Sequence, residues 1–266
     1  MRLLLFFSLF LSSSFVNAQE GVHHNLSIAG GIAHPSDSLA LSQNPAGLIY
    51  GKSTRVHLSL EQGRDQGPVG LGGGMIAGTE TVGGAVFLRD YNTEPGSVSR
   101  IYLFNLGMGV TVSPLNLAFG IAASKTLGKR DPLDSTNSCT NWCVDAGVIY
   151  NPAGAFRVAA NLTQLSDSNY LLGGGVAYDA TQELVLVADA QTDTQKNTMV
   201  LKPGIGIFIQ GIQVTGSYGF RAWGSREAGL RQGWGAGLSA SFIQNMLIEF
   251  YTNQFTHYYL GATLGL

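Results

Sequence analysis

The chain has 266 residues, a formal net charge of −2, 12% charged and 45% hydrophobic residues, and 36 glycines. A typical soluble domain carries about 25% charged residues and roughly 7% glycine, so this composition argues against an ordinary cytosolic enzyme. The near-neutral charge gives no electrostatic reason to expect nucleic acid as a partner, and the length permits one large domain.

The first 18 residues have the three parts of a secretory signal. Arg2 supplies a positive start, residues 3–11 form a short apolar run, and Val16-Asn17-Ala18 resembles a small-residue cleavage site. The apolar run is too short for a membrane-spanning helix. We therefore predict a signal peptide over residues 1–18 and export of the remaining chain from the cytosol.

Residues 19–51 are apolar and rich in turn-forming residues, and they lack the alternation that follows them. The run Asn44-Pro45-Ala46-Gly47-Leu48 lies near the end of this segment. Pro45 has a fixed φ angle and Gly47 permits a tight turn, so the run is suited to a compact fold. We predict that residues 19–51 form a separate amino-terminal segment ahead of a domain over residues 52–266.

From residue 52 to the carboxyl terminus, apolar residues alternate with small or polar ones. A period of two is typical of β-strands whose two faces meet different surroundings. The alternation predicts fourteen strands, or twelve if a weak glycine-rich strand is miscounted. They lie near residues 52–61, 69–77, 82–90, 100–112, 115–127, 143–150, 155–165, 170–179, 183–191, 199–209, 212–221, 232–243, 245–253 and 256–266.

Residues 101–124 carry no charge and are long enough to cross a bilayer as a helix. However, Pro114 lies at the centre of this stretch, and its apolar residues recur at every second position rather than at helical spacing. We therefore predict two strands joined by a turn at Ser113-Pro114.

The predicted connections differ in length from one end of the strands to the other. Short turns such as 113–114 and 210–211 alternate with longer polar loops such as 128–142 and 222–230. Bacterial outer-membrane barrels have short periplasmic turns and longer extracellular loops. We predict an all-β fold, a transmembrane antiparallel up-and-down β-barrel in the outer membrane of a Gram-negative bacterium, with membrane lipid around it.

In such a barrel the ionic residue of each strand is expected to face the lumen, because lipid surrounds the outside. The opposite face is then apolar, as Val56, Leu58 and Leu60 illustrate. A soluble β-sandwich also alternates, but these strands carry too few charges for two solvated surfaces. The residues predicted to face the lumen by this rule are Arg55, Arg89, Asp145, Arg157, Asp179, Asp189, Lys202, Arg221 and Glu249.

Apolar and cationic side chains share the predicted lumen. This combination suits an amphipathic ligand that carries a carboxylate. The alternative is that the cationic residues pair with the inward carboxylates of Asp145, Asp179, Asp189 and Glu249. The candidates for ligand binding are Phe87, Arg89, Leu103, Arg157, Lys202 and Arg221.

Pro203 and Gly204 fall within the predicted strand 199–209. Proline cannot donate a ladder hydrogen bond, and the neighbouring glycine favours a bulge. The pair therefore marks either a lateral gap in the wall that opens toward lipid or a tolerated kink.

Glycines crowd the second and third predicted strands. A smooth surface of small residues lets another molecule approach closely, which predicts a homo-oligomer formed through this face. The alternative is that these glycines make room inside the barrel for the amino-terminal segment. They are Gly70, Gly72, Gly73, Gly74, Gly78, Gly83 and Gly84.

The two cysteines, Cys139 and Cys143, lie in a polar loop of an exported chain, so we predict a local disulfide. Their spacing is not the C-x-x-C redox motif, and no histidine lies nearby to complete a metal site, so we predict no bound metal.

We predict no enzyme, no catalytic residues and no cofactor. His57 and Ser59 form an H-x-S pair on the first strand, and His257 on the last strand is expected to close beside His57. Motifs of the types G-x-S-x-G and H-E-x-x-H do not occur in the sequence. His57 is therefore expected to be a hydrogen-bonding residue of the lumen.

The run Asn44-Pro45-Ala46-Gly47-Leu48, preceded by residues 37–40 and placed just ahead of the first strand, resembles the amino-terminal hatch of the FadL-type family. Members of this family are outer-membrane transporters of long-chain fatty acids and other hydrophobic molecules. The resemblance implies a fourteen-stranded barrel, a hatch formed by this run, and lateral exit of the ligand through a wall defect.

On this resemblance we expect a channel that binds or passes small hydrophobic or amphipathic, fatty-acid-like molecules. The hatch, residues 19–51, either plugs the barrel or forms a short tail that caps its periplasmic end. The alternative function is a general porin, or a structural barrel that forms a homo-oligomeric ring and organises lipid.

Overall fold

The computed structural model describes residues 31–35, 40–50, 53–63, 69–79, 81–92, 100–127, 142–152, 154–164, 170–194, 197–224, 233–243, 246–253 and 257–266. The predicted signal peptide, residues 1–18, and the first part of the predicted amino-terminal segment lie outside these residues.

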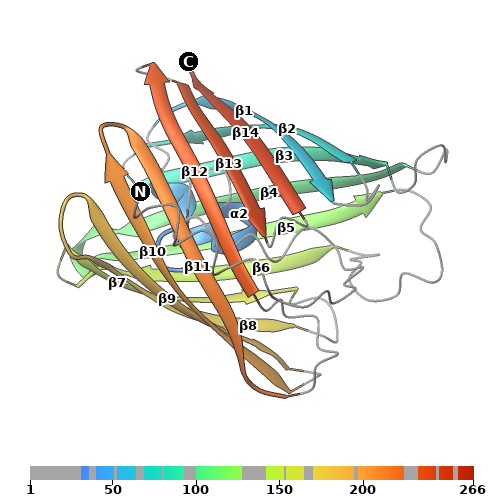
Figure 1. The fold of residues 1–266 in the computed structure, drawn as a ribbon. Helices are drawn as coiled ribbons and strands as arrows, with labels where there is room; N and C mark the ends of the chain where they lie inside the picture. Colours follow the sequence, from blue (N-terminus) through green and yellow to red (C-terminus); the bar gives the residue numbers. More distant parts are fainter. Residues whose placement is uncertain are drawn as a thin grey trace, which may run out of the picture.

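The described residues form fourteen antiparallel strands that close into one barrel (Figure 1). Each strand pairs with its neighbours in sequence, and β1 pairs with β14 to complete the ring. The fourteen-strand prediction is confirmed, and the twelve-strand alternative is wrong. The strands are β1 (Arg55–Gly63), β2 (Val69–Gly78), β3 (Val82–Asn92), β4 (Arg100–Val112), β5 (Leu117–Leu127), β6 (Cys143–Tyr150), β7 (Phe156–Thr163), β8 (Leu171–Asp179), β9 (Leu184–Asp193), β10 (Thr198–Ile209), β11 (Ile212–Trp223), β12 (Gly233–Ile243), β13 (Met246–Asn253) and β14 (His257–Gly265).

The uncharged stretch 101–124 forms two strands, as its period of two predicts. A single 3-10 turn, η2 (Ser113–Leu115), separates β4 from β5, and Asn116 ends it in the left-handed region with φ 51°. No helix in the described part of the chain is long and apolar enough to cross a membrane. The helical interpretation of this stretch is therefore wrong.

A second short connection, between β10 and β11, shows how the local sequence sets a hairpin. Gln210 and Gly211 both have positive φ angles, 49° and 83°. A two-residue loop with both φ angles positive matches the right-handed twist of the flanking strands. Glycine tolerates this conformation without strain, so the turn needs Gly211 where it stands.

The two faces of the wall differ as the alternation predicts. Large apolar side chains point outward and stay exposed, with Leu58 at 62% and Ile209 at 60%. The alternate residues point inward and are buried, and they include the ionic residues Arg89, Asp189 and Glu249. A closed sheet leaves no unpaired edge, so such a wall satisfies its backbone groups within lipid.

The register between β1 and β14 corrects one prediction. His57 lies opposite Thr263, whereas His257 lies opposite Gly63 at the other end of β1. Because the two strands are antiparallel, the first residue of β14 meets the last residue of β1. The expectation that His257 closes beside His57 is wrong.

Strand β10 continues through Pro203. It pairs with β9 without a break, and Pro203 lies opposite Ala188. Pairing with β11 joins Leu201 to Phe220 and resumes at Gly204 with Ser217. The missing pairs are expected where proline lacks an N–H group. The lateral gap at Pro203 and Gly204 remains a prediction.

Of the two cysteines, Cys143 begins β6, is buried and is disulfide-bonded. Cys139, the other cysteine of the sequence, lies outside the described residues.

Candidate functional site

Two short helical turns lie against the inside of the barrel. They are α2 (Ala40–Gln43) and η1 (Pro45–Tyr50), and they pack mainly on β2 to β6 (Figure 1). The residues Pro45 to Ile49 are all buried. We refer to residues 40–50 as the inner turn. It contains the run Asn44 to Leu48 that resembles a hatch.

Glycines on the inner face of the wall make the seat for this turn. An added Cβ atom at Gly120 would lie 2.1 Å from the carbonyl carbon of Pro45, and one at Gly83 would lie 2.0 Å from the carbonyl oxygen of Leu48. Both contacts involve backbone atoms, which cannot move aside cheaply. The inner turn therefore fits this wall only because these positions carry no side chain.

A third glycine, Gly147 on β6, accommodates the side chain of Asn44. A Cβ atom there would lie 1.9 Å from Asn44 Oδ1. The wall glycines in contact with the inner turn come from four neighbouring strands and include Gly83, Gly107, Gly109, Gly120 and Gly147. Sequence reasoning singled out only Gly83 among them, although inward parity combined with glycine identity could have found the others.

Asn44 joins the inner turn to its surroundings and is fully buried. Its Nδ2 donates to the carbonyl of Ile32 at 3.0 Å and to the carbonyl of Val148 on β6 at 3.4 Å. Its Oδ1 accepts from the backbone N–H of Ala46 at 3.1 Å. One amide side chain thus satisfies groups from the preceding segment, the turn and the wall, which buried polar groups require.

The wall also holds the segment 31–35. The carboxylate of Asp189 on β9 accepts from the backbone N–H of Ile32, with its two oxygens 3.2 and 3.1 Å from the nitrogen. Asn161 on β7 donates from Nδ2 to the carbonyl of Gln43. Asp189 was predicted to face the lumen, but its role as a backbone acceptor was not foreseen because the partner is distant in sequence.

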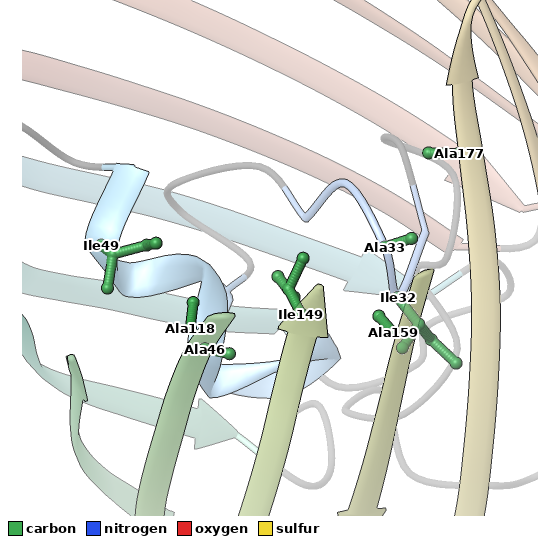
Figure 2. Packing of buried hydrophobic residues seen from close by; sticks show 8 residues of the cluster. All are labelled: Ile32, Ala33, Ala46, Ile49, Ala118, Ile149, Ala159 and Ala177. Atoms are coloured by element: carbon green, nitrogen blue, oxygen red, sulfur yellow. The ribbon is translucent and has the colours of Figure 1, made fainter. Parts of the chain in front are cut away.

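Apolar packing completes the seat. Figure 2 shows Ile32, Ala33, Ala46 and Ile49 of the amino-terminal segment packed among apolar wall side chains. The wall contributes Ala118, Ile149, Ala159 and Ala177 to this cluster. A second cluster joins Ala40, Leu41 and Leu48 to Ile76, Ala85, Phe87 and Ala122. Burying these groups from water stabilises the seated arrangement.

His34 and Tyr50 lie near the ion pair formed by Arg157 on β7 and Asp179 on β8. Burial, assisted by the positive charge of Arg157, lowers the pKa of His34 below its usual 6.5, while Asp179 opposes this shift. Burial raises the pKa of Tyr50, so that phenol stays neutral. The seated segment therefore holds His34 in its neutral form.

Acid is expected to weaken the packing of the amino-terminal segment against the barrel wall. Because the pKa of His34 is lower when the segment is seated, the unseated segment binds a proton more readily. The packing of residues 31–50 against the barrel wall is therefore most favourable above pH 6.5, and it weakens as the pH falls below 6.5. Ion conductance across a planar bilayer, measured at pH 5 and pH 8, should be higher at pH 5. His34→Gln should remove this difference, and a difference that persists in the variant would contradict the role of His34.

A polar and aromatic cluster fills the inside of the seam between β13, β14 and β1. His57 Nδ1 lies 2.8 Å from Thr263 Oγ1, and its Nε2 lies 2.6 Å from the hydroxyl of Tyr259. Tyr251 stacks on Tyr259, and its hydroxyl donates to Glu249 at 2.8 Å. These partners agree with the interpretation of His57 as a hydrogen-bonding lumen residue.

The six residues predicted to bind a ligand come from β3, β4, β7, β10 and β11 and do not gather at one place in the fold. Phe87 packs against His57 with ring centroids 5.5 Å apart. Arg157 pairs with Asp179, and Lys202 Nζ lies 3.5 Å from Gln191 Oε1. Phe87, Arg89 and Lys202 are buried, and Leu103 and Arg221 are half-buried.

The glycines of β2 and β3 divide between the two faces. Gly72, Gly74 and Gly83 face inward, where added Cβ atoms would meet Ser59, Phe87 and Leu48 respectively. Gly73 and Gly84 belong to the outward set, and added Cβ atoms there would make only ordinary contacts. The contact with Leu48 favours the idea that Gly83 makes room for the amino-terminal segment.

No protein-family model matches the sequence, and no curated protein matches it. Several solved structures do match the fold of this chain. The toluene transporter TbuX of Ralstonia pickettii has 13% identity and a TM-score of 0.60 over 91% of this chain and 96% of that chain. The monoaromatic hydrocarbon channel CymD has 10% identity and a TM-score of 0.60 over 91% and 99%. The deltaS2S3 mutant of the monoaromatic hydrocarbon channel TodX has 12% identity and a TM-score of 0.57 over 86% and 94%. At these identities the likeness shows the fold, and this chain has the fourteen-stranded barrel fold that these channels share.

Proposed function

We propose that the chain is an outer-membrane channel of the FadL type that passes small hydrophobic or amphipathic molecules, with the inner turn as its hatch. The observation that carries this proposal is the seat itself. A buried turn, held by Asn44 and fitted to wall glycines, lies within a barrel whose outer face is apolar.

The seat supports a hatch because the inner turn belongs to the chain ahead of β1 and not to any strand. A fourteen-stranded barrel is wide enough to need filling. Hydrogen bonds to β6, β7 and β9 and the two apolar clusters hold the segment against the wall. Such contacts exclude water on that side of the lumen, as a channel for water-insoluble molecules requires.

The nature of the ligand is part of the proposal. The structural neighbours are named as a toluene transporter and as monoaromatic hydrocarbon channels. Within the lumen, Arg157 is paired with Asp179, and Lys202 lies across from Asp189 in the β9–β10 ladder. Cations placed beside carboxylates favour a neutral hydrophobic ligand over a fatty-acid carboxylate.

Replacing Asn44 tests the hatch. Asn44→Ala removes the donor to two carbonyls and the acceptor for Ala46. Leaving these buried groups unpaired is expected to weaken seating by about 2–3 kcal/mol. Uptake of radiolabelled toluene by cells that carry this variant should fall well below wild type. The reason is that the water-excluding contacts between the hatch and the wall, which we expect to guide the ligand, are weakened. Labelled oleate, measured in parallel, tells the two ligand classes apart.

The control is Gln182→Ala, which changes an exposed residue of the turn before β9, outside the seat. Toluene uptake that stays at the wild-type level in folded Asn44→Ala protein would show that the hatch mechanism is wrong. Wild-type protein with a large, unselective ion conductance and no hydrophobic uptake would instead favour a general porin.

A further inference from the structure

Lys125 on β5 is an exception to the rule that places ionic residues in the lumen. The outward side chains of β5 include Phe119 and Ile121, which are 43% and 55% exposed, and Lys125 has the same parity. Among the charged strand residues whose side chains the structure describes, only Lys125 and Asp90 on β3 face outward in this way. Lipid surrounds this face, so a cation here must find a counter-charge or reach the edge of the hydrocarbon layer.

Lys125 lies near the end of the barrel that carries the long connections. It stands two residues before the end of β5 at Leu127, and β6 begins only at Cys143. At its other end, β5 follows the three-residue turn η2. Long connections are typical of the extracellular end of an outer-membrane barrel, so Lys125 lies at the level of the headgroups of the outer leaflet.

Aromatic side chains hold Lys125 in place. Its Nζ lies 5.6 Å from the ring centroid of Trp142, which is a cation–π contact. Phe104 lies opposite Lys125 in the β4–β5 ladder and packs edge-on against the same ring, with centroids 6.2 Å apart. Trp142 is 43% exposed, as expected of an aromatic residue at a membrane interface. The ammonium group is thus oriented over a partly exposed ring at the level of the headgroups.

The charge of Lys125 is not neutralised within the described part of the chain. No carboxylate there forms an ion pair with Lys125, whose charge meets only the ring of Trp142. Asp90 shares the outward face, but it lies two strands away and one outward row higher, opposite Tyr102. An ammonium over an aromatic ring still has hydrogen-bond donors to offer. The wall therefore presents a cation that an anionic group from outside the barrel can reach.

The outer surface next to Lys125 is apolar toward the middle of the wall. Ala123 is the next outward residue of β5, and the ladders place it between Leu106 on β4 and Val144 on β6. Both flanking side chains are 38% exposed, and the surface continues to Ile121. A cation above an exposed apolar surface matches the two parts of an anionic lipid, a charged headgroup and acyl chains.

We propose that Lys125 and Trp142 bind the headgroup of a phosphorylated glycolipid of the outer leaflet, of the lipid A class. The ammonium donates to a phosphate oxygen, the Trp142 ring lies against the sugar, and the acyl chains lie along Ala123 and Ile121. Phe104 positions the ring. This site is on the outside of the barrel, so the inference goes beyond the proposed function and does not depend on a ligand in the lumen.

The test is a titration of the full chain in detergent micelles, followed by native mass spectrometry. The probes are lipid A, which carries phosphate groups, and fully dephosphorylated lipid A with the same acyl chains. Wild-type protein should bind lipid A about fivefold more tightly than the dephosphorylated lipid. Lys125→Met keeps the side-chain length but removes the charge, so it should make the two affinities equal. A magnesium-free buffer keeps carboxylates such as Asp90 from binding phosphate through a metal ion.

Three further variants separate the site from general charge and folding effects. Lys125→Arg should retain the preference for lipid A, and Trp142→Leu should weaken binding of both lipids. Arg55→Gln is the matched control, because it removes one positive charge at the opposite end of the barrel, at the start of β1, and should bind as wild type does. Lys125→Met should unfold at the same urea concentration as wild type or at a higher one, since it removes a charge from the lipid-facing wall.

Four outcomes would overturn this inference. The first is equal affinity of wild type for the two lipids, and the second is an equal loss in Lys125→Met and Arg55→Gln. The third is unchanged affinity for both lipids in Trp142→Leu. The fourth is displacement of lipid A by millimolar inorganic phosphate, which would show a site for free anions rather than for a lipid.

The proposed function is judged separately, by toluene uptake. A chain that binds lipid A as expected but takes up no toluene would leave the lipid site standing and overturn the hydrophobic channel. A chain that takes up toluene but does not distinguish the two lipids would overturn the lipid site alone.

Discussion

Replacing Gly120 with leucine should unseat the inner turn and let ions through the barrel. A Cβ atom at this position would lie 2.1 Å from the carbonyl carbon of Pro45 and 2.2 Å from the backbone nitrogen of Ala46. Overpacking of this kind costs about 1–3 kcal/mol, which corresponds to roughly a tenfold to hundredfold shift toward the unseated state. The measurement is the ion conductance of purified protein in a planar bilayer, which should rise well above wild type.

The matched control for Gly120→Leu is Gly174→Leu. Both positions are strand glycines, but Gly174 faces outward and an added Cβ atom there makes no close contact. The control should conduct as wild type does. Folded Gly120→Leu protein with unchanged conductance would mean that the inner turn does not close the lumen.

Replacing His57 with alanine should destabilise the whole barrel rather than open it. His57 is fully buried, bonds Thr263 and Tyr259 on β14, and packs edge-on against Phe87. Removal leaves a cavity and two hydroxyls without their partner, with an expected loss of about 3–5 kcal/mol. The effect is large because these bonds join β1 to β14, where the ring closes.

Urea unfolding in detergent micelles measures this loss. The folded fraction at each urea concentration is read from the band of folded protein on a gel, which shifts only after heating. His57→Gln keeps both a donor and an acceptor and should recover part of the stability. Leu58→Met changes the adjacent, outward-facing residue at similar volume and should leave the midpoint near wild type. A midpoint for His57→Ala equal to that of Leu58→Met would contradict a closing role for the His57 contacts.

Much of the wall could be predicted from the sequence because its signal is local. Alternation with a period of two identifies strands such as β4 and β5 and gives the inward or outward direction of each side chain, as Arg89 and Leu58 show. A membrane strengthens this signal, since lipid allows almost no charge on one face. The short turns follow from residues such as Gly211, whose conformation depends only on neighbouring atoms.

The contacts of the candidate site could not be predicted in this way. Asn44 was singled out for its resemblance to a hatch motif, yet its partner carbonyl on Val148 lies 104 residues away. The pairing of Ile32 with Asp189 spans 157 residues. Such contacts depend on which strand lies across the lumen, and alternation carries no information about that.

The sequence by itself predicted the fold class, fourteen strands with twelve as the alternative, and the inward or outward direction of many wall residues, because each strand residue faces either lipid or the lumen. Only the tertiary structure decided the register of β1 on β14, which placed Thr263 rather than His257 beside His57. It also decided which glycines receive the inner turn. These properties depend on the closure of the ring, which brings together residues that no local pattern relates.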